Sequence, residues 1–297
     1  MVKIAYCLLV HKNPKQVTRL LKNLYSDEDL FYVNVFNAIS AKKIWEKQLK
    51  KLVNDNVFII FKYRNAWAQF PCVQATLDSM KFFQNFEYDY FINLTGQCYP
   101  IKSNKTIKEF FGGKNFAYME FFKVPKIGWG KCGGLERIKY SYYKNPIFVF
   151  YTYAINSFLR SKKLETRKFI KIPKLKRLPY NLKPYGGSAY FCITKKHVSY
   201  LLKYLNDKTD LIKFFTRVFA PDELFFQTIL LNSELKKTIV NNNLRYIRWS
   251  EDGRTPCTLT FKDKDALLSS PALFARKFDI DVDESILNLL DVCRNEY

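Results

Sequence analysis

Short apolar runs alternate with longer amphipathic segments along the first hundred residues. The apolar runs have the length of buried strands, and the amphipathic segments have the length and period of helices. The predicted strands cover 3–10, 31–35, 57–61 and 88–94, and the predicted helices cover 14–25, 41–53 and 66–83. Short strands separated by such helices favour βαβ units, so the pattern predicts an α/β fold with a mainly parallel sheet.

The second half of the chain also carries marked helix starts. Pro221 and the acids Asp222 and Glu223 precede the apolar run LFFQTILL, an arrangement typical of a first helical turn. The chain shows no internal repeat and no low-complexity linker. We therefore predict one α/β domain, interrupted by a long insertion.

The insertion differs from the rest of the chain in its charge. Between residues 122 and 177 there are 15 Lys and Arg residues against Glu136 and Glu165, which gives +13 of the formal net charge of +22. This excess indicates phosphate-bearing partners. The centre of the insertion, 146–159, is aromatic and apolar but too short to span a bilayer. Two interpretations remain open: an anchor on an anionic membrane surface through 145–178, or a buried helix followed by a solvated basic loop.

The cysteines and histidines exclude a zinc site. Seven cysteines are scattered so that none lies closer than 26 residues to the next, and the chain has only two histidines. An odd and scattered set of cysteines favours a reducing compartment and buried thiols. The N-terminal apolar run is short for a signal peptide, so we expect a buried first strand and a cytoplasmic protein.

A glycine-rich string at 128–133 fits the GxGxxG pattern formally. A dinucleotide-binding loop should close the first strand and be followed about 20 residues later by an acid. This string lies in the middle of the chain, and no acid occurs between Glu136 and Glu165. A flexible loop is the favoured interpretation.

Several charged residues allow a chemical and a structural interpretation. The run at 279–284, DIDVDE, could hold a divalent ion, but it leads into an amphipathic helix, where acids cap the first turn. Glu223 could act as a base, or it could serve only the helix start. Arg254 and Lys277 could bind phosphate, although such cations more often lie on the surface.

Together, these strings resemble a known family. They are AYCLLVHKNP, AWAQFPCVQATLDSM, YDYFINLTGQCYPIKSN, GGSAYFCIT, FAPDELFFQTIL, LRYIRW, GRTPCT and LFARKFDIDVD. In this order they are similar to the core-2/I-branching β-1,6-N-acetylglucosaminyltransferases of glycosyltransferase family 14, which also holds peptide-core xylosyltransferases. The resemblance covers 2–102 and 184–290, and 121–183 is unmatched.

The resemblance implies a fold and a reaction. The fold would be a single GT-A domain of Rossmann type over 1–297, with a nucleotide-sugar-binding half at 1–120, the basic insertion at 121–183 and an acceptor and catalytic half at 184–297. Glu223 matches the family's catalytic base. Arg254 and Lys277 match two cations on the donor diphosphate, which can replace a metal ion. No metal and no other cofactor is expected beside the UDP-sugar donor.

Further matches and departures concern both substrates. Trp249 and Glu120 match acceptor-binding positions, and Val10 matches a residue beside the uridine. An acid that the family places near the uridine is Phe36 here, so recognition of the uridine must differ. An acceptor-site Tyr of the family is Glu251. Both departures leave the identities of donor and acceptor open.

The sequence thus predicts a metal-independent inverting glycosyltransferase. The favoured reaction transfers GlcNAc from UDP-GlcNAc to form a β-1,6 branch on a cell-surface glycan, built on a lipid carrier at the cytoplasmic face of the membrane. A xylosyltransferase of the same family is the first alternative. An inactive membrane-binding module on this fold is the second. No nucleic-acid partner is expected, since the basic residues form no reader motif.

Overall fold

A computed structural model describes residues 1–36, 42–49, 52, 55–64, 67–144, 169–174, 177–253 and 255–295. Its centre is a seven-stranded sheet in the order β12-β6-β11-β4-β1-β2-β3. These strands are β1 (Ile4–Val10), β2 (Leu30–Val35), β3 (Val57–Ile60), β4 (Tyr90–Thr95), β6 (Ala117–Met119), β11 (Phe191–Thr194) and β12 (Ile239–Val240). The neighbours β4, β1, β2 and β3 are mutually parallel, as are β12 and β6, and β11 runs antiparallel to both of its neighbours. The predicted α/β fold with a mainly parallel sheet is confirmed.

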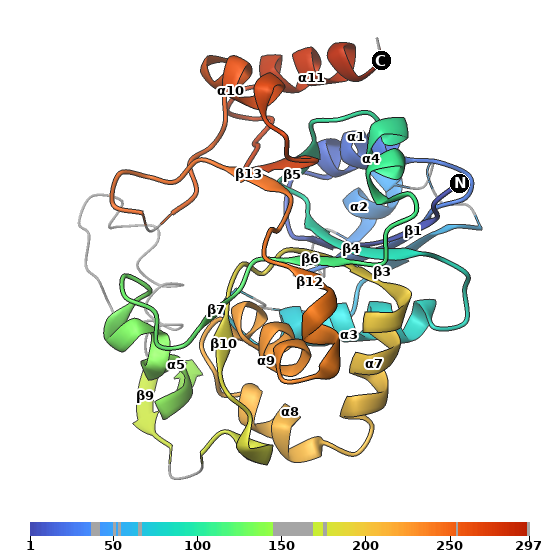
Figure 1. The fold of residues 1–297 in the computed structure, drawn as a ribbon. Helices are drawn as coiled ribbons and strands as arrows, with labels where there is room; N and C mark the ends of the chain where they lie inside the picture. The colour runs from blue at the N-terminus through green and yellow to red at the C-terminus, as the bar shows by residue number, and fades with distance from the viewer. Residues whose placement is uncertain are drawn as a thin grey trace.

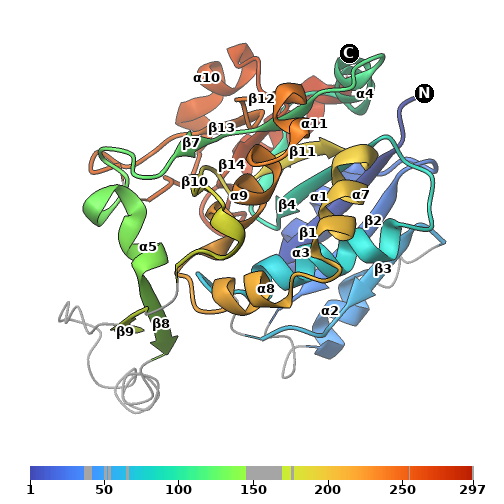
Figure 2. The same cartoon turned by 60° about the horizontal axis from the view of Figure 1, so that its bottom comes forward.

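Helices cover both faces of this sheet (Figures 1 and 2). In Figure 1 the helices α1 (Pro14–Leu24), α2 (Lys42–Leu49), α4 (Asn104–Phe111), α10 (Lys264–Ser269) and α11 (Ser285–Asn295) lie above it. The helices α3 (Pro71–Phe83), α7 (Lys195–Leu205), α8 (Thr209–Phe215) and α9 (Phe225–Leu231) lie below it. The short helix α5 (Leu135–Lys139) lies at the side of the domain.

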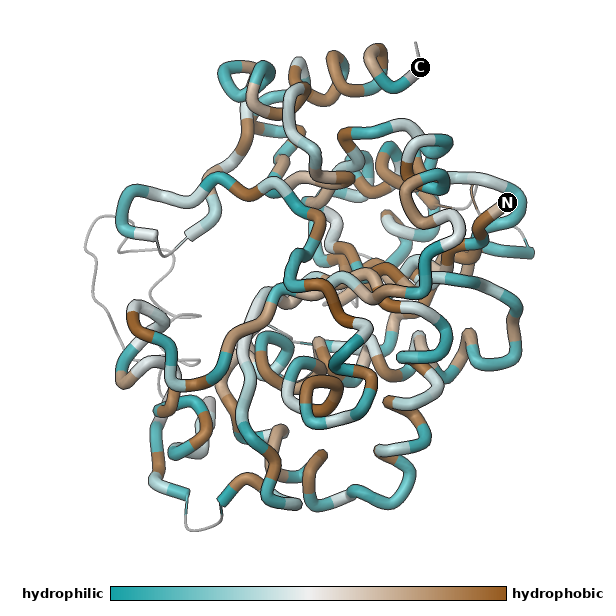
Figure 3. The backbone as a smooth tube through the Cα atoms, in the orientation of Figure 1, coloured by the Kyte–Doolittle hydropathy of each residue, from teal (hydrophilic) through white to brown (hydrophobic). Residues whose placement is uncertain are grey.

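The alternation of side chains along β1 explains the two layers. Ile4, Tyr6 and Leu8 join the core cluster that includes α1 and α11, whereas Ala5 and Cys7 join the cluster that includes α3, α7 and α9. Successive strand residues point to opposite faces, so a strand that is apolar throughout is buried on both sides. Figure 3 shows the apolar residues gathered in these central strands.

Smaller strand pairs lie outside the main sheet. They are β5 (Cys98–Pro100), β13 (Arg245–Ile247) and β14 (Phe274–Arg276) in a three-stranded sheet, β7 (Phe122–Lys123) with β10 (Tyr185–Gly186), and β8 (Tyr140–Lys144) with β9 (Phe169–Pro173). We call α5, β8 and β9 with the loop 124–134 the basic arm. It contains the described residues from the centre of the unmatched segment.

Two predicted helix starts differ from the structure. The helix predicted over 66–83 begins at Pro71, because Ala68 has a φ of 55° and breaks the helical path before it. Residues Pro221–Glu223 form a single 3-10 turn, and the α-helix begins at Phe225 after Leu224, whose φ of −135° interrupts it. The apolar run at 146–159 lies outside the described residues. Within the described residues, no helix has both the length and the apolar character needed to cross a membrane.

The acidic run at 279–284 has the structural role favoured by its sequence. Asp283 accepts hydrogen bonds from the backbone N–H groups of Ser285 (2.8 Å) and Ile286 (3.3 Å) and so caps α11. Asp279 forms an ion pair of 2.6 Å with Lys12. In the part of the chain that the structure describes, no group of three or more His, Cys, Asp or Glu side chains is placed to hold a metal ion.

All seven cysteines are free thiols. Three of them are buried, which agrees with the expectation of buried thiols, but Cys132 is exposed. It lies in the glycine-rich string, where a surface turn carries its side chain outward.

Candidate active site

The parallel strands end at one edge of the sheet, where ligands bind in this class of fold. Val10 at the end of β1 lies opposite Val35 at the end of β2, and Leu9 lies opposite Thr95 at the end of β4. The chain order of the strands reverses between β1 and β4, which defines the topological switch point. The crevice outside this edge is therefore the expected place for a nucleotide.

Val10 itself is fully buried in the core. Its carbonyl oxygen accepts a hydrogen bond of 2.8 Å from the backbone N–H of Phe36. This hydrogen bond joins the ends of β1 and β2. Because the side chain of Val10 is buried, a sugar-nucleotide donor could contact Val10 only through its backbone.

Glu223 is held by its backbone beside the loop that follows β10. The N–H of Gly187 donates a hydrogen bond of 3.0 Å to the carbonyl oxygen of Glu223. A Cβ atom at Gly187 would lie only 1.9 Å from the carbonyl oxygen of Glu120, so this loop can approach Glu120 only as glycine. The backbones of Glu120, Gly187 and Glu223 are therefore packed together.

The side chain of Glu120 turns to a different partner. Its Oε2 accepts a hydrogen bond of 2.9 Å from Nδ2 of Asn243, just before β13. The predicted acceptor residue thus lies next to the segment of Glu223 through its backbone, and its carboxylate is fixed by Asn243.

The carboxylate of Glu223 pairs with a cation from the basic arm. Nη1 of Arg137 lies 2.5 Å from Oε2 of Glu223, and the two side chains are 14% and 35% exposed. The guanidinium of Arg137 stacks on Trp129, with its carbon 4.0 Å from the ring centroid. The cation and the ring restrain the position of the carboxylate while leaving part of it accessible.

Two glycines make the slot that holds Trp129. A Cβ atom at Gly134 would lie 2.2 Å from Cε3 of the indole, and one at Gly186 would lie 2.8 Å from Cη2. Gly134 and Gly186 therefore have a packing role, because they make room for the ring on which Arg137 lies.

Asp222, next to Glu223, is in a different environment. Its Oδ1 is buried and has no hydrogen-bond partner among the described residues. Burial first, and then the negative charge of Glu223, raise the pKa of the Asp222 carboxyl well above its usual range. Two adjacent acids thus have separate environments, which suits different roles.

The end of β14 carries two adjacent cations, Arg276 and Lys277. Arg276 stacks over Tyr190 at 4.7 Å and interacts electrostatically with Glu223. The next residue, Lys277, is half-buried and forms no ion pair with any described residue. A cation without a carboxylate partner is available for an anionic ligand.

A hairpin connects Lys277 with the other predicted residues. Trp249 bridges to Pro256 across the hairpin and is 52% exposed. The N–H of Leu259 donates a hydrogen bond of 2.9 Å to the carbonyl oxygen of Lys277. Arg254 lies outside the described residues. In Figures 1 and 2 this hairpin extends on the same side of the domain as α5.

Burial lowers the pKa of both histidines, and one of them has a structural role. His197 is buried between the hydroxyl groups of Thr194 (2.8 Å) and Thr238 (3.1 Å), and burial lowers its pKa to about 4. Burial first, then the charge of Lys12, lower the pKa of His11. His197 is a structural residue.

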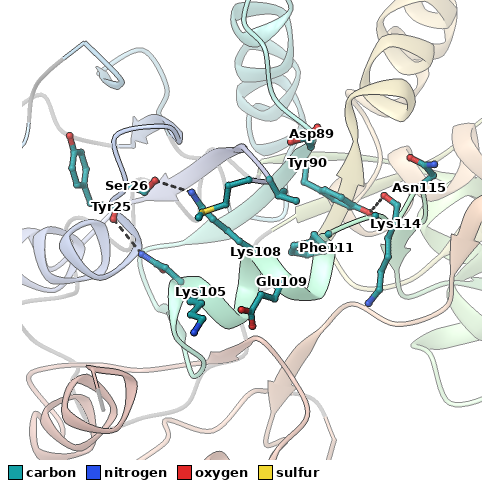
Figure 4. A pocket seen from close by; sticks show the side chains of 15 residues that line it. Tyr25, Ser26, Asp89, Tyr90, Lys105, Lys108, Glu109, Phe111, Lys114 and Asn115 are labelled. Carbon is teal, nitrogen blue, oxygen red and sulfur yellow. Dashed lines mark hydrogen bonds between the residues drawn. The ribbon is translucent and has the colours of Figure 1, made fainter. Parts of the chain in front are cut away.

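A large cavity lies at the opposite edge of the sheet (Figure 4). It measures about 940 Å³ and is lined by the chain start, by Asp89 and Tyr90 before and in β4, and by α4. Lys108 in its wall is already paired, with Nζ 2.9 Å from Oγ of Ser26 and 3.1 Å from Oδ2 of Asp29. None of the predicted site residues lines this cavity.

The switch point, the partly exposed carboxylate and the cation at the end of β14 suit an α/β protein that binds a nucleotide. A family model for the Core-2/I-Branching enzyme matches residues 4–267. The chain therefore belongs to the Core-2/I-branching family of glycosyltransferases, and its α/β fold with a mainly parallel sheet agrees with the fold that the resemblance implied.

The chain is also similar to individual relatives and to a solved structure. The chain is 27% identical to xylosyltransferase 2 of Rattus norvegicus and of Homo sapiens over 318 residues, which cover 98% of this chain and 33% of each relative. It is 24% identical to xylosyltransferase 1 of Rattus norvegicus over 98% of this chain and 35% of that protein. The chain thus spans about a third of the length of these relatives. Among solved structures, mouse xyloside xylosyltransferase 1 matches with 14% identity and a TM-score of 0.37, covering 91% of this chain and 96% of that one.

Sequence reasoning did not find Arg137 and Trp129. Both lie in the segment that resembled nothing known, and we interpreted its glycines as a flexible loop. Gly134, five residues after Trp129, was the signal for a tightly packed ring. The pairing of Arg137 with Glu223 depends on a contact between residues 86 positions apart.

Proposed function

We propose that this chain is an inverting glycosyltransferase that uses a UDP-sugar donor. The observation that supports this most directly is the Glu223 carboxylate, which is partly exposed, restrained by Arg137 and close to the cationic end of β14. Glu223 accepts the proton of the acceptor hydroxyl while that oxygen attacks the anomeric carbon. The bond to UDP breaks on the opposite face, so an α-linked donor gives a β-linked product.

In this proposal, cations stabilise the leaving UDP. Lys277 and Arg254 bind the diphosphate and neutralise the charge that develops as the glycosidic bond breaks. The availability of Lys277 for an anion supports its part, and the family resemblance supports that of Arg254. We propose on this basis that the reaction needs no metal ion.

Two donors and one class of acceptor belong to the proposal. The similarity to xylosyltransferases favours UDP-xylose, whereas the resemblance to branching enzymes favours UDP-GlcNAc and a β-1,6 linkage. Trp249 provides an exposed aromatic face on which a sugar ring can stack, and Glu120 lies beside the catalytic segment. We propose a glycan on a lipid carrier as the acceptor, at the cytoplasmic face of a membrane.

The test is calorimetric binding of UDP, UDP-xylose, UDP-GlcNAc and UDP-glucose, each with EDTA and again with manganese. We expect one sugar nucleotide to bind in EDTA, and Lys277→Ala to weaken its binding at least tenfold. Glu223→Gln should keep the binding and lose transfer. Binding only with manganese would contradict metal independence, and no binding under either condition would favour an inactive module.

A further inference from the structure

A run of three asparagines, 241–243, joins two loops at one edge of the main sheet. The run follows β12, and Glu120 follows β6, which pairs parallel with β12. The N–H of Phe121 donates a hydrogen bond of 2.8 Å to Oδ1 of Asn241, and Nδ2 of Asn241 donates one of 3.0 Å to the carbonyl oxygen of Phe121. These two bonds fix the backbone of the loop that carries Glu120.

The third asparagine, Asn243, is buried and directs its amide at Glu120. Its Oδ1 accepts a hydrogen bond of 2.9 Å from the N–H of Arg245, and its Nδ2 donates the bond of 2.9 Å to Oε2 of Glu120. Arg245 is buried as well, and its Nη2 donates a hydrogen bond of 2.9 Å to the carbonyl oxygen of Asn93 in β4. The amide that contacts Glu120 is therefore anchored to the main sheet.

The carboxylate of Glu120 keeps one oxygen open. Its side chain is half-buried, and Oε1 accepts no hydrogen bond from a described residue and is not enclosed by the protein. Glu120 also forms no ion pair with a described residue, although the chain has 49 Lys and Arg against 27 Asp and Glu. An open carboxylate oxygen accepts a strong hydrogen bond from a hydroxyl group and repels a phosphate or a carboxylate.

Glu120 lies beside the segment of the proposed base. The close approach of Gly187 to the carbonyl oxygen of Glu120 and the hydrogen bond from Gly187 to the carbonyl oxygen of Glu223 mean that one residue contacts both acids through its backbone. A substrate that presents one hydroxyl to Glu223 can therefore present a second hydroxyl to Glu120.

We propose that Asn243 is a positioning residue for acceptor recognition. It holds Oε2 of Glu120, so that Oε1 is directed at a second hydroxyl of the acceptor, and the acceptor that fits is uncharged at this position. Without the amide, the acceptor would have to order a flexible glutamate when it binds. A purely structural role is not needed for Asn243, because Asn241 already fixes the loop. This inference rests on the function proposed above and adds the residue that controls acceptor binding.

The test compares two matched variants of the full chain. Asn243→Asp places a second carboxylate where the amide donated to Glu120. The side chain of Asn242 is exposed, and its Oδ1 accepts a hydrogen bond of 2.8 Å from the N–H of Leu244. Asn242→Asp can keep this bond, so it adds the same charge without touching Glu120. A third variant, Glu120→Gln with Asn243→Asp, exchanges the amide and the carboxylate and restores the hydrogen bond between them.

Four measurements separate acceptor binding from the other functions of the site. Calorimetry gives the UDP affinity, and urea unfolding gives the stability. Hydrolysis of UDP-xylose and UDP-GlcNAc by water reports the donor and the base without an acceptor sugar. Transfer to p-nitrophenyl β-D-xyloside and p-nitrophenyl β-D-galactoside reports the acceptor site.

We expect Asn243→Asp to lower kcat/KM for the glycosides about 10- to 100-fold, mainly through KM, because a hydrogen bond to a charged group is lost. UDP affinity and hydrolysis should stay within about threefold of the wild type, and so should every measurement on Asn242→Asp, since an exposed charge has little effect. The exchange variant should recover most of the loss in transfer, because the open oxygen is held in place again.

Three results would overturn the inference. They are wild-type transfer by Asn243→Asp, equal losses in the two single variants, and a loss of transfer that the exchange variant does not recover although its stability is restored. A parallel loss of hydrolysis and transfer in Asn243→Asp would also overturn it, because the damage would not be confined to the acceptor. A wild type that neither binds UDP nor transfers a sugar would instead refute the proposed function, on which this inference depends.

Discussion

The closest backbone approach in the candidate active site is at Gly187, and it yields a quantitative prediction. A Cβ atom there would lie 1.9 Å from the carbonyl oxygen of Glu120, whereas real Cβ contacts stay above 3.0 Å. Gly187→Ala must therefore separate the two segments by at least 1.1 Å, the difference between these distances. Either the hydrogen bond of 3.0 Å from Gly187 N–H to the carbonyl oxygen of Glu223 would break, or Glu223 would move together with Gly187.

Both stability and rate should respond. Overpacking destabilises the protein by about 1–3 kcal/mol and the lost hydrogen bond by about 1 kcal/mol. The change from glycine to alanine offsets about 0.4–1 kcal/mol of this, because it lowers the conformational entropy of the unfolded chain. We expect a net loss of about 2–3 kcal/mol in the free energy of unfolding. A displacement of Glu223 by about 1 Å should lower kcat/KM on the order of 100-fold.

The assay compares Gly187→Ala with Gly112→Ala. Gly112 has an ordinary φ of −56°, and a Cβ there would lie 3.3 Å from the carbonyl oxygen of Glu109, far from the site. Urea unfolding gives the stability, calorimetry the UDP affinity, and initial rates kcat/KM. Because the glycine lies away from the ends of β1 and β2, UDP affinity should persist in both variants. Wild-type stability and turnover in Gly187→Ala would refute the steric reasoning.

Three further predictions concern the support of the site and the fold. Trp129→Ala should lower kcat/KM about tenfold without changing UDP affinity, because Arg137 loses about 1 kcal/mol of stacking. Trp129→Phe should keep most of the wild-type rate, since it keeps an aromatic ring. Identical rates in both variants would contradict this role of Trp129. His197 has a pKa lowered by burial from 6.5 to about 4, so its contribution to stability is complete above pH 6.5 and is lost as the pH falls toward 4. Urea unfolding at both ends of this range should show that the free energy of unfolding of the wild type falls by up to about 3 kcal/mol at the acidic end. The decrease should be smaller in His197→Gln. An equal decrease in both proteins would contradict this role of His197. Since all seven cysteines are free, a reducing agent should leave the unfolding midpoint unchanged, and a shift of several degrees would show a disulfide.

Much of the fold follows from the periodicity of the chain. The apolar runs of β1 and β4 are buried on both faces, and such strands are recognised by composition alone. Helix ends were less predictable. The positive φ of Ala68 depends on the local path of the chain, so the sequence pattern extended the helix back to residue 66 although it begins at Pro71.

The site was predictable where it depends on ordered strings and was missed where it depends on packing. Glu223, Lys277 and Trp249 lie in strings with a family resemblance. Arg137 lies in a segment without such a resemblance, and its role follows from a contact across the fold. Charge counts alone described that segment only as basic, since they cannot show which cation faces an acid.

The two neighbouring acids Asp222 and Glu223 lead to the last prediction, because only one of them can act as the base. Burial and the charge of Glu223 raise the pKa of Asp222, so a larger share of its carboxyl is protonated near neutral pH than in an ordinary aspartate, and the protonated form cannot act as a base. Its Oδ1 is also enclosed by protein. Asn has the shape of a neutral Asp, so Asp222→Asn should keep kcat/KM within about threefold at pH 7, whereas Glu223→Gln should lose about 10²–10⁴-fold. The reverse result, with Asp222→Asn inactive and folded while Glu223→Gln still turns over, would transfer the role of base to Asp222.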